Sequence, residues 1–337
     1  MTINNRAAFA LLAILSGSLF GGIVPARSHD PTSSEPVKDG GLSGPVDAAE
    51  RWVVLPDGRR IKIKCAGSGS PAVILQGGLG WLERPSWSKV QPEVSRFARV
   101  CAYDPAGTGD SDPGPLPRDG AHLVTDLHTL LLAAGEKPPY VLVGHSRGGL
   151  LIRIYTAHFP GEIAGLVFVD PSVPGQFDLL GGRDTLADGK AYFSRCLAGA
   201  KSGQMQPGGA LFAECHIYPE SWPAVLGLAQ RPATWETNLS VYESFDADCA
   251  EIAATEHPPY TMPLIVLTAS ERNPGLTKAL SEGSQREWLN ASQKRLASLS
   301  TRGEQRLVDQ SSHYIQIDQP AAVVKAIKDV IGERPGR

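Results

Sequence analysis

Short apolar runs alternate with amphipathic stretches along most of the chain. Runs that are apolar at successive positions are typical of parallel strands buried on both faces. These runs are Ala72–Leu75, Arg99–Tyr103, Tyr140–Val143, Leu166–Val169, Leu264–Thr268 and Arg306–Val308. Two earlier segments, Arg51–Leu55 and Arg60–Cys65, flank a Pro-Asp-Gly turn and predict a hairpin. Helical periodicity between the runs, as in His122–Ala134, completes the pattern of a doubly wound, mostly parallel α/β sheet.

One long interval breaks this alternation. About ninety residues, approximately 172–260, carry no strong strand signal and are rich in Trp, Tyr and Phe. A structureless loop of that length is improbable inside a compact domain. The interval therefore predicts a helical cap inserted above the sheet, within a folded domain that spans residues 48–337.

The first residues have the pattern of an export signal. A basic start is followed by an apolar run from Ala7 to Val24 and by small residues up to Ala26. This predicts a cleaved signal peptide over 1–26, a secreted or periplasmic protein and no stable membrane insertion after cleavage. An uncleaved membrane anchor is the alternative. Residues 27–47 are rich in Pro, Ser, Gly and Asp and predict a disordered linker.

Composition narrows the possible partners. The 337-residue chain has 42% hydrophobic residues and a net charge of −3, which is typical of a globular protein and gives no basic field for nucleic acid.

Export permits disulfides among the five cysteines. Cys65 could pair with Cys101 if their strands are neighbours, and Cys196 could pair with Cys215, leaving Cys249 odd. Free buried thiols remain the alternative, and the oligomeric state is not predicted.

The clearest chemical signal is the segment Gly144-His-Ser-Arg-Gly-Gly149. It follows an apolar strand and precedes a helical stretch, which is the setting of a nucleophile elbow. Gly144 and Gly148 allow the tight turn that raises Ser146 above the sheet edge. His145 would then point away from the pocket.

A serine hydroxyl needs a base before it can act as a nucleophile. Of the eight histidines, His313 follows the last apolar run and precedes the terminal helix. That loop lies at the carboxyl edge of the sheet, where α/β proteins place their sites. We therefore expect His313 to be the base.

These motifs together resemble the α/β-hydrolase superfamily, specifically serine-esterase-like members with a helical cap. The segments that carry the resemblance are Leu75–Gly80, Tyr103–Ser111, Val143–Gly149 and Ser312–Ile315. They occur in the family's order over residues 50–335. The resemblance implies hydrolysis of a small-molecule carboxylic ester without a cofactor. A serine at the elbow argues against dehalogenases and epoxide hydrolases, which use a carboxylate nucleophile.

The acid of the triad must be a carboxylate at the carboxyl end of a strand. Asp170 directly follows the run Leu166–Val169, and Glu271 follows Leu264–Thr268 at a greater distance. The family uses either position in different members. We favour Asp170, with Glu271 as the alternative and neither residue as the remaining possibility.

An acyl-transfer intermediate also needs donors for its oxyanion. The backbone N–H of Arg147 is one candidate, and the second comes from the turn Gln76–Gly80. By alignment to the family's His-Gly turn, Leu79 or Gly78 supplies it. The sequence contains no metal-binding motif of the HExxH or CxxC type, so we expect no metal.

The sequence thus favours an exported, carboxylesterase-like serine hydrolase that works through an acyl-enzyme. A lactonase, a thioesterase or an aminopeptidase could use the same triad. A hydrolase-like binding protein without turnover is the alternative from a different class.

Overall fold

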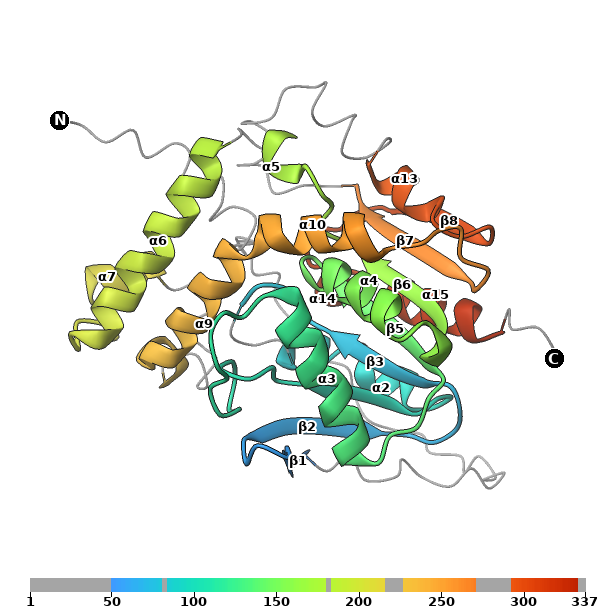
Figure 1. The fold of residues 1–337 in the computed structure, drawn as a ribbon, viewed down its shortest axis with the longest axis horizontal. Helices are drawn as coiled ribbons and strands as arrows, with labels where there is room; N and C mark the ends of the chain where they lie inside the picture. The colour runs from blue at the N-terminus through green and yellow to red at the C-terminus, as the bar shows by residue number, and fades with distance from the viewer. Residues whose placement is uncertain (1–49, 81–83, 180–182, 216–226, 271–291, 333–337) are drawn as a thin grey trace, which may run out of the picture.

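The computed structural model describes residues 50–80, 84–179, 183–215, 227–270 and 292–332, which Figure 1 draws in colour. The expected signal peptide (1–26), the expected linker (27–47) and the alternative acid Glu271 lie outside these described residues.

The described strands form one sheet in the order β1-β2-β4-β3-β5-β6-β7-β8. Their bounds are β1 (Glu50–Val54), β2 (Arg60–Ala66), β3 (Ala72–Gln76), β4 (Val100–Tyr103), β5 (Tyr140–His145), β6 (Ile163–Val169), β7 (Leu264–Ala269) and β8 (Gly303–Val308). Strand β2 runs antiparallel to β1 and β4, and all other neighbours are parallel. The predicted mostly parallel sheet and its initial hairpin are therefore confirmed.

Helices cover both faces of this sheet. The bounds outside the interval between β6 and β7 are η1 (Pro85–Trp87), α2 (Gln91–Val94), α3 (Gly120–Ala134), α4 (Gly148–His158), η2 (Pro160–Glu162), α13 (Gln293–Ala297), α14 (Ile315–Asp318) and α15 (Pro320–Gly332). Helices α3 and α4 lie on one face, and α2 and α15 lie on the other (Figure 1). The sheet is consequently buried on both sides, as the continuous apolar runs require.

Alternation along each strand divides the core between the two faces. In β5, Leu142 packs into the cluster beneath α3 and α4, whereas its neighbour Val143 packs into the cluster beneath α15. The same division holds for Phe168 and Val169 in β6. Because successive side chains point to opposite faces, each central strand contributes to both clusters.

The described part of the interval between β6 and β7 is helical. Its elements are α5 (Gln176–Leu179), α6 (Arg183–Lys201), α7 (Ala210–Cys215), α9 (Pro232–Glu243) and α10 (Phe245–Thr255). Helix α10 lies against α4, whereas α6 and α7 project away from the sheet (Figure 1). Side chains of α6, α7 and α9 form a third apolar cluster around Trp235. This part of the chain therefore has a core of its own.

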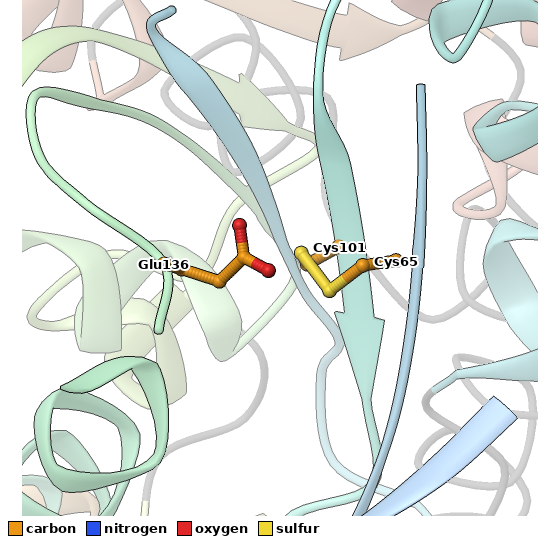
Figure 2. Close-up of side chains that lie close together, drawn as sticks. All are labelled: Cys65, Cys101 and Glu136. Carbon is orange, nitrogen blue, oxygen red and sulfur yellow. A yellow bond between two sulfur atoms is a disulfide. The ribbon is translucent and has the colours of Figure 1, made fainter. Parts of the chain in front are cut away.

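Two disulfides are present, and both predicted pairings are confirmed. Cys65 and Cys101 face each other directly on β2 and β4, and their sulfur atoms are bonded (Figure 2). Cys196 in α6 is bonded to Cys215 in α7. Cys249 is a half-buried free thiol.

Among the described residues, no helix is both long and apolar enough to cross a bilayer.

Candidate functional site

Ser146 occupies the sharp turn between β5 and α4. Its φ of 53° lies in the left-handed region, which a non-glycine residue adopts only under constraint. Its backbone N–H donates to the carbonyl of Val169 at 3.1 Å, and its own carbonyl accepts from the N–H of Ser172 at 2.8 Å. The end of β6 therefore holds this unusual backbone in place.

The glycines on either side of the turn are required by close backbone contacts. A Cβ on Gly144 would lie 2.5 Å from the carbonyl oxygen of Gly148. A Cβ on Gly148 would lie 2.5 Å from the carbonyl oxygen of Gly77. Neither distance is possible for real atoms, so the chain can make this turn only with glycine at both positions.

The structure brings Asp170 and His313 together at the carboxyl edge of the sheet. Asp170 follows β6 with a φ of 40°, and its buried carboxylate accepts from the N–H of Ala269 through Oδ1 at 3.2 Å. Its Oδ2 lies 2.7 Å from His313 Nδ1. Since a carboxylate only accepts, Nδ1 carries the hydrogen, and Nε2 is left as the basic nitrogen. The side chain of His313, which carries Nε2, is 16% exposed and therefore partly accessible.

His145, the last residue of β5, does not simply point away from the site. Its Nε2 lies 3.0 Å from the backbone carbonyl of His313, and the two rings are 4.7 Å apart. Burial lowers the pKa of His145 to about 3, and the neighbouring His313 adds to this effect. The strand pattern could give the orientation of His145 but not the loop that packs on it, so sequence reasoning missed this contact.

The turn after β3 lies directly against the elbow. A Cβ on Gly78 would lie 2.8 Å from Cβ of Ser146. Leu79 packs both on the main core and on the cluster around Trp235. Arg147 directly precedes α4 and has helical backbone angles, so its N–H lies at the helix N-terminus. The candidate oxyanion donors are thus on two elements that meet at Ser146.

A narrow cavity of about 10 Å³ lies beside this turn. Gly78, Leu79 and Arg147 line it from the side of the elbow. Thr237 and Asn238 line it from α9. The helical insertion therefore reaches the immediate surroundings of the candidate oxyanion donors.

The side chain of Arg147 continues past this cavity to α10. Its Nη2 donates to Oδ2 of Asp248 at 2.5 Å, and both side chains are buried. Burial raises the pKa of the Asp248 carboxyl, and the positive charge of Arg147 opposes this rise. No sequence signal marked Asp248, because its partner lies 101 positions away.

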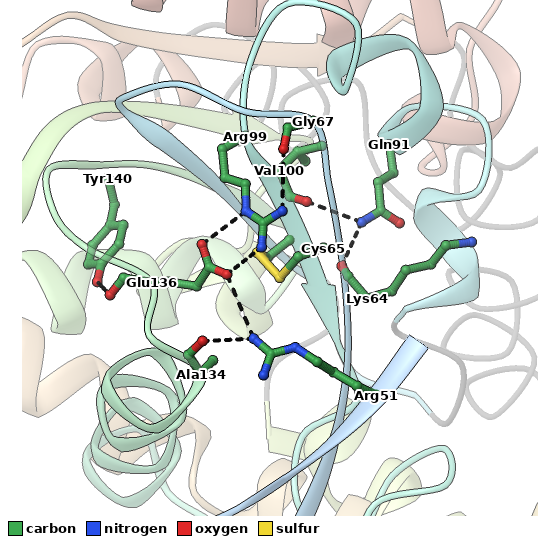
Figure 3. The surroundings of a disulfide bond; sticks show 11 residues. Arg51, Lys64, Cys65, Gly67, Gln91, Arg99, Val100, Ala134, Glu136 and Tyr140 are labelled. Carbon is green, nitrogen blue, oxygen red and sulfur yellow. Dashed lines mark hydrogen bonds and ion pairs between the residues drawn. A yellow bond between two sulfur atoms is a disulfide. The ribbon is translucent and has the colours of Figure 1, made fainter. Parts of the chain in front are cut away.

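One group of side chains in the described residues has the spacing of metal ligands. Cys65, Cys101 and Glu136 offer atoms within 4.8 Å of one another (Figure 2). However, the two sulfur atoms are bonded to each other, and Glu136 forms hydrogen bonds to Arg99 at 2.6 and 3.1 Å (Figure 3). Arg51 adds a second positive charge 3.9 Å from the same carboxylate. A group whose donors are already bonded or ion-paired does not suit a metal ion.

Comparison with known proteins shows a family and individual hydrolases to which the chain is similar. The model of the alpha/beta hydrolase family matches residues 67–326. The putative carbamate hydrolase RutD of Cronobacter sakazakii is 30% identical over 158 residues, which are 46% of this chain and 53% of that protein. The 2-hydroxy-6-oxo-2,4-heptadienoate hydrolase of Pseudomonas putida is 32% identical over 147 residues, which are 42% of this chain and 51% of that protein.

A solved structure with a similar fold is a putative aryl esterase from Burkholderia cenocepacia. It has a TM-score of 0.54 and 24% identity, and the match covers 86% of this chain and 100% of that one. The chain spans about a third to a half of the length of most curated relatives that it matches.

Proposed function

Because this chain belongs to the alpha/beta hydrolase family, we propose that it is a serine hydrolase that cleaves a carboxylic ester through an acyl-enzyme intermediate. The observation that carries the proposal is the 2.7 Å hydrogen bond between Asp170 and His313 at the edge of the sheet. Ser146 stands at the same edge on a left-handed elbow. A nucleophile, a base and an orienting carboxylate are the three parts that this chemistry needs.

In the proposed reaction, Ser146 Oγ bonds to the ester carbonyl carbon while its proton moves to His313 Nε2. The carbonyl oxygen becomes an oxyanion, for which the N–H groups of Arg147 and of Leu79 or Gly78 are the donors. The C–O bond to the alcohol then breaks, and the alcohol leaves with the proton from His313. In the second half, water attacks the carbonyl of the acyl-enzyme while its proton moves to His313. The carboxylic acid then leaves, and Ser146 Oγ regains the proton. Asp170 keeps the Nδ1 hydrogen of His313 directed and stabilises the imidazolium in both halves.

The helical insertion is proposed as a cap over this site. Thr237 and Asn238 of α9 line the cavity beside Leu79 and Arg147. A Cβ on Gly107, in the turn after β4, would lie 2.0 Å from Thr237 Oγ1, so α9 sits tightly on the body of the protein. These contacts support a role for the insertion in excluding water and shaping the entrance.

Export is also proposed. The apolar run before Ala26 has the composition of a signal peptide. The disulfides Cys65–Cys101 and Cys196–Cys215 support an oxidising compartment, where such bonds persist. Mass spectrometry of the mature protein tests this directly: a new N-terminus near residue 27 supports export, and an intact Met1 in secreted material contradicts cleavage.

A fluorophosphonate probe tests the catalytic proposal without knowledge of the natural substrate. We expect the full chain to be labelled at Ser146 and the Ser146→Ala variant to remain unlabelled. Asp170→Asn should slow labelling by roughly 10³- to 10⁴-fold, because His313 loses the acceptor that fixes its tautomer. Asp112→Asn is a matched control, since Asp112 pairs with Arg60 at the protein surface. A wild-type chain that is never labelled would favour the binding protein without turnover.

Substrate class is tested separately with nitrophenyl esters, homoserine lactones, thioesters, aminoacyl amides and carbamates. The carbamates are included because the relative RutD is a putative carbamate hydrolase. The proposal expects the highest kcat/KM with an ester. If another class is clearly preferred and Ser146 is still required, that class is the substrate in place of an ester, and the proposed triad stands.

A further inference from the structure

His145 connects the nucleophile elbow to the loop that carries the base. It is the last residue of β5 and directly precedes Ser146, and only 4% of its surface is exposed. The loop between β8 and α14 passes over its ring and places the carbonyl of His313 within 3.0 Å of Nε2. The contact joins residues 168 positions apart.

The direction of this hydrogen bond follows from its acceptor. A backbone carbonyl only accepts, so Nε2 of His145 must carry the hydrogen and donate it. The low pKa of His145 means that the ring is neutral, with Nδ1 unprotonated. A Cβ on Gly78 would lie 3.4 Å from this Nδ1. The His145 ring therefore lies between the loop of the base and the turn that faces the elbow.

His313 is held by other elements at two points. Asp170 holds its ring through Nδ1, and His145 holds its backbone through the carbonyl. Hydrogen bonds from Ser312 in the loop to Asp318 at the end of α14 shape the loop locally but do not tie it to β5. With the ring and the backbone both fixed, the position of Nε2 relative to the elbow is determined.

We infer that His145 is a positioning residue for the proposed reaction: its Nε2–H fixes the backbone of His313 and thereby aligns the base with Ser146. This inference rests on the proposed function. A neutral donor suits the task, because a positive charge 4.7 Å from the ring of His313 would oppose formation of the imidazolium. Small errors in the placement of a catalytic group are costly, so the contact should influence the chemical step rather than substrate binding.

Two variants of similar shape test the inference. His145→Gln keeps an N–H donor that can reach the position of Nε2, whereas His145→Met has none. We expect His145→Met to lower both the fluorophosphonate labelling rate and kcat about 10-fold, the loss typical of one hydrogen bond, with KM unchanged. His145→Gln should recover the rate to within about 3-fold of wild type. A general loss of packing would affect both variants alike.

Three further variants keep the test decisive. His145→Phe is a second variant without a donor and retains a ring, so it replaces His145→Met if that protein does not fold. His158 provides the matched control, since it is the exposed last residue of α4 and pairs with Glu251. His158→Gln and His158→Met should both be labelled at the wild-type rate.

The outcomes separate this inference from the proposed function. If wild type is labelled at Ser146 and His145→Met or His145→Phe reacts as fast as His145→Gln, the positioning role is wrong and the serine hydrolase remains. If wild type is not labelled, the proposed function fails and the inference fails with it. A slower donor-free variant together with rescue by glutamine supports both.

Discussion

Removing the charge of Asp248 should destabilise the protein strongly, because it would leave Arg147 buried without its counter-ion. The side chains of Arg147 and Asp248 are 6% and 0% exposed, and the ion pair measures 2.5 Å. The other carboxylate oxygen accepts from the N–H of Gly120 at 2.6 Å. Among the described residues, Arg147 Nε has no hydrogen-bond partner, so Asp248 is the main compensation for this buried charge.

Asp248→Asn isolates the charge, because asparagine can still accept from Gly120. Breaking a buried ion pair by removing one partner costs about 3 to 5 kcal/mol of unfolding free energy. Arg147→Met leaves the carboxyl of Asp248, whose pKa burial already raises and whose favourable cation is then gone. That carboxyl can take a proton, so the loss in Arg147→Met should become smaller as the pH falls. The double variant should lose less than Asp248→Asn alone.

Urea unfolding followed by circular dichroism measures these changes. The pair Arg195–Glu214 between α6 and α7 is the control, since its side chains are 49% and 43% exposed. Glu214→Gln should therefore cost no more than about 1 kcal/mol. A loss below about 1 kcal/mol in Asp248→Asn, similar to that control, would refute the claim that an unpaired Arg147 charge is costly here.

Two other predictions concern the surroundings of Ser146. Gly78→Ala should lower kcat about 10-fold or more, because its new Cβ would lie 2.8 Å from Cβ of Ser146. Gly161→Ala is the control and should leave kcat unchanged, because the space around its Cβ is open. Equal kinetics in the two variants would contradict this prediction. His145 should make the protein sensitive to acid. Its pKa is about 3 in the folded state and ~6.5 unfolded, so the unfolded chain binds the proton first. The stabilisation is present above about pH 6.5 and is lost toward pH 3, by up to about 1.4 kcal/mol per pH unit. The urea midpoint should therefore fall less between pH 7 and pH 4.5 in His145→Gln than in wild type. Equal falls in the two proteins would contradict the role of His145 in acid sensitivity.

The strands and the elbow could be predicted because their causes are local. A run such as Tyr140–Val143 is apolar at every position because helices cover both faces of the sheet. Gly144 is needed for a contact within the turn, with the carbonyl oxygen of Gly148. Gly148 instead faces the carbonyl oxygen of Gly77 after β3, and only the spacing of the motif predicts a glycine there. Asp170 and His313 could be predicted as partners because both follow parallel strands, whose carboxyl ends share one edge. The structure places the Asp170 carboxylate 2.7 Å from His313 Nδ1.

Contacts of His145 and Arg147 could not be predicted, because they depend on which distant element packs over the elbow. Alternation along β5 gives the face on which His145 lies, but not the loop that covers that face. Arg147 could equally have been solvated at the start of α4. Its burial results from α10, whose position depends on the folded insertion rather than on the sequence around residue 147.

The insertion itself consists of parts with different attachments to the body, and this limits which of them could move if it acts in the proposed role of a cap. Helix α10 is fixed to α4 by Arg147–Asp248 and by Arg153–Glu256, whose side chains are also buried. It therefore behaves as part of the helical layer on the sheet. Helices α6 and α7 instead pack in the cluster around Trp235 and are joined by Cys196–Cys215. Local opening follows the elements with fewest buried ties to the body, so a movement that admits substrate should displace α6 and α7 and leave α10 in place.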